Sequence, residues 1–69
     1  MKEYVVDVRG MSCSSCERRV IEALKRLYGV NDVRADYRRN EVVITADSID
    51  ERDVKQAIEK LGYTVYRFM

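Results

Sequence analysis

The sequence contains no histidine and no proline, and cysteine occurs only twice among its 69 residues. The absence of histidine removes the commonest zinc ligand and the commonest general base. An excess of charge of one sign is also missing, because thirteen basic residues against twelve acidic ones leave a net charge of +1. There is thus no general electrostatic reason for binding to nucleic acid or to an anionic membrane, and we expect no nucleic-acid partner.

Long apolar runs are absent as well. No run approaches the ~20 residues that a membrane-spanning helix needs, so we expect no direct insertion into a membrane. Residues 1–10 alternate apolar and charged side chains, which differs from the apolar centre of a signal peptide and indicates a cytoplasmic protein. The composition, 46% hydrophobic and 36% charged, is typical of one globular domain over residues 1–69.

The two cysteines, Cys13 and Cys16, are poorly placed to act as a structural staple. A domain of this size buries a modest core and often needs one. The stabilisation from a disulfide grows with the length of the loop that it closes, and a bridge between these two positions would close only a tiny loop. We therefore expect that the fold does not depend on a bond between them.

The hydrophobic pattern changes period several times along the chain, which is typical of an α+β domain. Residues 2–9 alternate apolar and charged side chains and predict a strand with one buried face. Apolar residues at helical spacing then predict a helix over 15–28, with Ser14 as its N-cap in a capping box completed by Glu17. Gly29 is the predicted stop of this helix.

The rest of the chain predicts three more strands and a second helix. In chain order these are a strand over 32–37, a turn over 38–40, a strand over 42–45, a capping box over Ser48–Glu51, a helix with apolar residues from Val54 to Leu61, a stop at Gly62 and a strand over 63–69. The order β-α-β-β-α-β predicts a ferredoxin-like α+β fold. In this fold two helices cover one face of a four-stranded antiparallel sheet.

The segment between the first strand and the first helix, residues 10–16, carries both cysteines. Cys13 is expected in the loop and Cys16 in the first helical turn, and the two residues between them let both sulfurs converge on one point. A helix N-terminus presents unpaired N–H groups and a partial positive charge, which lower the pKa of a nearby thiol. The sequence therefore predicts a pair of thiolates near the surface.

Three interpretations of this pair are open on the residues alone. Soft thiolates select soft ions, and Cu(I) accepts two ligands where zinc requires four. Without histidine or a third cysteine, a structural zinc site within one chain is excluded, and a site with four sulfurs from two chains remains open. A cysteine pair at the start of a helix is also the thioredoxin arrangement, which makes thiol–disulfide redox chemistry the second interpretation. Against it, a thioredoxin fold needs more chain and another strand order. The third interpretation is a pair of inert core residues, and the neighbouring serines argue against it.

The segment Gly10–Cys16 resembles the Gly-Met-Thr-Cys-x-x-Cys signature of the heavy-metal-associated domain. This is the family of cytosolic copper chaperones and of the N-terminal metal-binding domains of copper-transporting P-type ATPases. Residues 27–30 resemble its Leu-Pro-Gly-Val turn, and residues 57–63 resemble its closing helix and loop, so the resemblance covers essentially the whole chain. Ser12 replaces the usual threonine and Tyr28 the usual proline, and neither change removes a ligand.

The resemblance implies that Cys13 and Cys16 bind Cu(I) and transfer it to a partner by thiolate ligand exchange, without enzymatic activity. Ag(I) and Hg(II) are alternatives to Cu(I) as the carried ion, because all three are soft and a preference for soft ions does not distinguish them. The implied partner is a copper-transporting P-type ATPase or its metal-binding domains, or a copper chaperone. The implied state is a monomer, with a metal-bridged dimer as the alternative.

Four further residues are expected to support the metal loop, namely Met11, Ser12, Ser14 and Tyr63. Met11 is expected to pack against the core rather than to act as a third, thioether ligand. Tyr63 is expected beside the loop, either as a group that screens the sulfurs or as a plain core aromatic. Basic residues on the first helix predict a face that would steer docking to an acidic partner, and they are Arg18, Arg19, Lys25 and Arg26.

Overall fold

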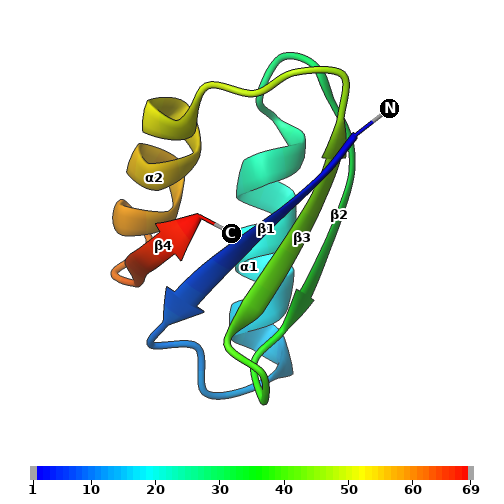
Figure 1. The fold of residues 1–69 in the computed structure, drawn as a ribbon. Coiled ribbons are helices and arrows are strands. Elements are labelled where there is room, and N and C mark those ends of the chain that lie inside the picture. Colours follow the sequence, from blue (N-terminus) through cyan, green and yellow to red (C-terminus); the bar gives the residue numbers. More distant parts are fainter. Residues whose placement is uncertain (1, 69) are drawn as a thin grey trace.

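A computed structural model describes residues 2–68 of the protein. Its elements follow the predicted order and are β1 (Lys2–Arg9), α1 (Ser14–Lys25), β2 (Val30–Asp36), β3 (Glu41–Ala46), α2 (Glu51–Glu59) and β4 (Thr64–Phe68). The four strands form one antiparallel sheet in the order β2-β3-β1-β4. Figure 1 shows α1 and α2 on the same face of this sheet, so the predicted ferredoxin-like fold is confirmed.

The core lies between the sheet and the two helices. The alternating strands place every second side chain toward the helices, and the central register pairs Val6 with Val42 and Tyr4 with Ile44. The fully buried residues come from both layers, and the largest are Leu24, Ile44, Ile58, Val6, Val8, Val20, Val42 and Val54. No side chain among residues 2–68 is buried and polar, so this core is held by apolar packing.

The start of α1 differs from the prediction, because the N-cap residue is Cys13 and not Ser14. An N-cap residue keeps an extended backbone, and Cys13 has φ −160° and ψ 173° while Ser14 is already helical. The carboxylate of Glu17 does not close a capping box, since it accepts the backbone N–H of Tyr37 at 2.8 Å. The helix also ends at Lys25, earlier than predicted, and a turn follows it.

The start of α2 differs in the same way. Its N-cap is Asp50, whose side chain accepts the N–H of Arg52 at 2.9 Å, so Ser48 is not the cap. An aspartate directly before the helix satisfies a free N–H group that a more distant serine cannot reach. The predicted turn between β2 and β3 is confirmed, and Asn40 takes the left-handed backbone with φ 55°. No helix within residues 2–68 is long and apolar enough to cross a membrane.

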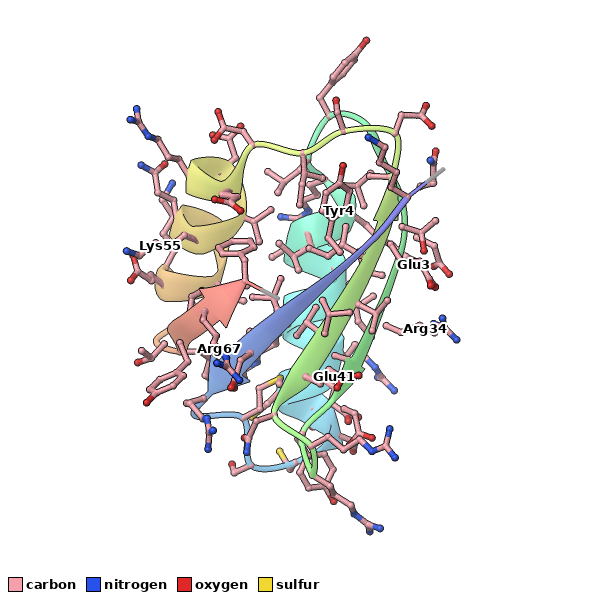
Figure 2. The ribbon with its side chains drawn as sticks, viewed as in Figure 1. Glu3, Tyr4, Arg34, Glu41, Lys55 and Arg67 are labelled. Carbon is pink, nitrogen blue, oxygen red and sulfur yellow. The ribbon has the colours of Figure 1, made fainter. Side chains whose placement is uncertain are left out.

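The far face of the sheet carries charges of both signs. Figure 2 shows Glu3 and Arg34 pointing away from the helices, and their side chains form an ion pair at 3.3 Å. Arg9 pairs with Asp7 at 3.1 Å on the same face. These exposed pairs contribute little to stability, and they offer no extended basic surface.

Candidate metal centre

The loop that joins β1 to α1 is held against the core by one buried side chain. Gly10 leaves the strand with φ +107°, a backbone conformation that favours glycine. Met11 follows and is 6% exposed, packed within the apolar core. The thioether therefore serves packing, and it fixes the inner side of the loop while the next residues stay at the surface.

The two sulfurs meet at the first turn of α1. The Sγ atoms of Cys13 and Cys16 lie 3.6 Å apart, with Cys13 exposed and Cys16 half-buried. The carbonyl of Cys13 accepts the N–H groups of Cys16 at 3.1 Å and of Glu17 at 3.3 Å, so the helix begins on the first cysteine. Both cysteines are thus fixed to the same helical turn, and their side chains converge as the spacing predicted.

The surroundings favour the thiolate of Cys16. The backbone N–H of Ser12 makes the largest contribution, followed by the side chains of Tyr63 and Cys13, and together they lower the pKa of Cys16 from 9.0 to about 6. Burial acts in the opposite direction. The hydroxyl of Ser12 lies 3.9 Å from the sulfur of Cys16 and adds a weaker contact. These are donors aimed at an anionic sulfur.

Tyr63 lies in the segment between α2 and β4 and contacts the loop. A Cβ atom added at Gly10 would lie 3.3 Å from Cδ1 of Tyr63, so ring and loop are in close contact. The hydrogen bond to Cys16 raises the pKa of Tyr63, burial adds to this, and Arg19 acts against it. The tyrosine therefore lies beside the sulfur pair, where the sequence predicted it.

Within residues 2–68, the two sulfurs are not part of a larger cluster of histidine, cysteine, aspartate or glutamate side chains. Across residues 2–68, no group of three or more histidine, cysteine, aspartate or glutamate side chains is arranged to hold a metal ion. Glu17, the acidic residue nearest to Cys16 in sequence, directs its carboxylate to the N–H of Tyr37. Ser14, predicted to support the loop, is the exposed first residue of α1. Such a pair can hold an ion that accepts two soft ligands.

The sequence did not reveal that the turn between β2 and β3 lies beside this loop. Figure 1 shows the turn next to the segment that joins β1 to α1. Two hydrogen bonds connect the turn to the elements that flank the loop, from the N–H of Tyr37 to Glu17 in α1 and from the N–H of Val8 in β1 to the carbonyl of Asn40 at 2.9 Å. The same turn carries the exposed Arg38 and Arg39. No local pattern predicts contacts between residues twenty or more positions apart.

Residues 5–64 match the family model of the heavy-metal-associated domain. The chain belongs to the heavy-metal-associated domain family. Relatives of this domain occur in proteins of different size and function. The chain is 41% identical over 64 residues to a mercuric reductase of Bacillus cereus, covering 91% of this chain and 10% of that protein. It is 36% identical over 62 residues to a zinc/cadmium/lead-transporting P-type ATPase of Shigella sonnei (strain Ss046), covering 90% of this chain and 8% of the ATPase.

The domain also matches a relative of its own length. It is 38% identical over 67 residues to the copper chaperone CopZ of Staphylococcus haemolyticus (strain JCSC1435), covering 94% of this chain and 98% of CopZ. Among solved structures, a CopZ metallochaperone superposes with a TM-score of 0.87 at 30% identity, covering 93% of this chain and 98% of the other. The chain therefore spans a small part of the reductase and ATPase relatives and nearly all of the chaperone.

Proposed function

We propose that this heavy-metal-associated domain binds Cu(I) through Cys13 and Cys16 and transfers it to a partner protein by thiolate exchange. It acts as a carrier and not as an enzyme. The observation that carries the proposal is the pair of sulfurs 3.6 Å apart at the start of α1, one of them exposed. The donors that lower the pKa of Cys16 keep this sulfur in the form that binds metal.

The number of donors favours Cu(I) over zinc. Zinc in proteins is almost always bound by four ligands, whereas Cu(I) is stable with two thiolates. The relatives include a mercuric reductase and a zinc/cadmium/lead-transporting ATPase, so the family by itself does not select the ion. Ag(I) and Hg(II) are soft enough to compete for two sulfurs. Four-coordinate zinc would need further donors besides the two sulfurs, and a second copy of the chain in a metal-bridged dimer could supply two.

Transfer follows from the unequal exposure of the two sulfurs. A partner thiolate adds to the open side of the bound ion, which then has three sulfur ligands. The bond to the exposed Cys13 breaks first and the bond to half-buried Cys16 breaks last, each after a new bond has formed. Each displaced thiolate can then take up a proton. The ion therefore never leaves as a free species.

The partner in this proposal is a copper-transporting P-type ATPase or one of its metal-binding domains, or a copper chaperone, met in the cytoplasm. A Cu(I) ion with two thiolates carries a net charge of −1, and cations next to it stabilise it. The exposed arginines near the loop come from α1 and from the turn before β3, and they are Arg18, Arg19, Arg38 and Arg39. Such a basic rim would accelerate docking to an acidic surface.

The test is an anaerobic titration of the reduced domain with Cu(I) in competition with a chromophoric chelator. The wild type is expected to bind one ion, and Cys13→Ser or Cys16→Ser to lose most of the affinity while the circular dichroism spectrum is kept. Ser15→Ala, an exposed change between the cysteines, is the matched control. Tight binding by the double serine variant, or failure of the wild type against a mild competitor, would refute the proposal.

The second candidate function is thiol–disulfide exchange, because sulfurs at 3.6 Å and a thiol with a lowered pKa also suit a redox pair. A redox protein would cycle its disulfide with a reductase at a useful rate. A carrier would bind Cu(I) tightly and be reduced only slowly by such an enzyme. Measuring both rates and affinities on the same preparation separates the two functions.

A further inference from the structure

The turn between β2 and β3 is hydrogen-bonded to both elements that flank the metal loop, namely the end of β1 and the first turns of α1. At the entrance, the carbonyl of Asn40 accepts the N–H of Val8, two residues before Gly10. At the exit, the carboxylate of Glu17 accepts the N–H of Tyr37 in a partly buried hydrogen bond of 2.8 Å. The strand before the loop and the helix after it are therefore both connected to one turn.

The hydrogen bond at the exit acts directly on the helical turn that carries Cys16. The N–H groups of Cys16 and Glu17 both donate to the carbonyl of Cys13, so these three residues move as one unit. Helical residues in succession point about 100° apart, which lets Glu17 face the β2–β3 turn while Cys16 faces Tyr63. An anchor at Glu17 thus sets the position of the adjacent sulfur without touching it.

The turn itself is rigid enough to act as an anchor. The carboxylate of Asp36 accepts the N–H groups of Arg38 at 3.0 Å and of Arg39 at 3.4 Å. The guanidinium of Arg38 lies over the ring of Tyr37, 5.8 Å from its centroid. Asn40 closes the turn with the left-handed backbone that its short side chain tolerates. The N–H of Tyr37 is therefore presented in a fixed direction.

We propose that Glu17 is a positioning residue for the metal site: its carboxylate anchors the sulfur-bearing turn of α1 to the β2–β3 turn and keeps the two sulfurs at metal-binding distance. The proposal rests on the proposed function, since it assigns a role within the same site. Groups that orient metal ligands typically change metal affinity by about 10–100-fold when they are removed. Because Glu17 orients the backbone rather than a ligand atom, we expect the lower end of that range.

The test compares Glu17→Ala with Glu17→Gln, which keeps an oxygen acceptor, and with Glu22→Ala, an exposed glutamate on the same helix. Cu(I) affinity is measured by chelator competition well below the unfolding temperature, on variants whose circular dichroism spectra show that they are folded. Glu17→Ala is expected to bind about tenfold more weakly, Glu17→Gln to recover most of the loss and Glu22→Ala to match the wild type. Hydrogen exchange at the N–H of Tyr37 should accelerate only in Glu17→Ala.

A second probe and a second variant keep the result decisive. A trivalent aryl arsenical bonds to two thiols at once and reports the sulfur pair without Cu(I). Asp36→Ala loosens the turn without altering α1. If Glu17→Ala does not fold, this variant takes its place, and it is expected to bind both Cu(I) and the arsenical more weakly than the wild type. Equal affinity of Glu17→Ala and Glu22→Ala for both probes would overturn the positioning role. If the wild type does not bind Cu(I), the copper function is rejected. If Glu17→Ala alone then binds the arsenical more weakly, the positioning role is kept.

Discussion

Removing the hydroxyl of Tyr63 provides a direct test of how the site favours a thiolate. The side chain of Tyr63 is the second largest contribution to the lowered pKa of Cys16, after the backbone N–H of Ser12. Tyr63→Phe keeps the ring that lies against Gly10 and deletes only the hydrogen-bond donor. The pKa of Cys16 is therefore expected to rise from about 6 and to remain below 9.0, because Ser12 and Cys13 still act on the sulfur.

The consequence at neutral pH is large. A thiol with a pKa of about 6 is roughly 90% thiolate at pH 7, whereas an ordinary thiol at 9.0 is roughly 1% thiolate. Intrinsic nucleophilicity falls as the pKa falls, with a Brønsted coefficient of about 0.4–0.5, which over this interval costs about 15–30-fold. The net gain in reaction rate with a disulfide reagent is then only about 3–6-fold. Reactivity alone is thus a weak readout, and the protonation state must be measured.

The assay follows the Cβ chemical shift of Cys16 by NMR across a pH titration of the reduced, metal-free domain. The matched control is Tyr66→Phe, because Tyr66 lies 67% exposed on the far face of the sheet, under Arg9. The wild type and the control should show an inflection near pH 6, and Tyr63→Phe should show a higher one. An unchanged inflection in Tyr63→Phe, or a wild-type inflection near 9, would refute the account of the site given above.

Three further outcomes are expected. Because the pKa of Cys16 is depressed by folding, the reduced domain should lose stability as pH falls from 9 to 6, and thermal melts of Cys16→Ser should lack this slope. Leu24→Ala, at a fully buried position, should cost about 2–5 kcal/mol of a total of about 3–10 kcal/mol, measured by urea unfolding; a cost below 1 kcal/mol would contradict the packing. Gly10→Ala should destabilise more than Gly62→Ala, since both have positive φ but only the Cβ at position 10 meets Tyr63; equal losses would contradict that contact.

Most of the fold follows from local patterns that a sequence displays. Strand β1 was predicted with the bounds 2–9 and is observed over Lys2–Arg9, because alternation over eight residues leaves one choice of buried face. The helix starts were less predictable. A serine followed three residues later by glutamate occurs at the start of both helices, yet the caps are Cys13 and Asp50. At α2 the aspartate directly before the helix provides the cap, whereas at α1 the carboxylate of Glu17 accepts the N–H of Tyr37 and closes no capping box.

The sequence by itself determined that two thiols would share the first turn of a helix, since the spacing of Cys13 and Cys16 and the helical periodicity after them are local properties. It also determined the order of strands and helices along the chain, and hence the sheet from which the loop extends. Only the tertiary structure decided that Tyr63 makes a hydrogen bond to Cys16 and that the β2–β3 turn lies beside the loop. Tyr63 and the β2–β3 turn reach the loop because β1 lies between β3 and β4 in the sheet, which brings distant segments to the same end of the molecule.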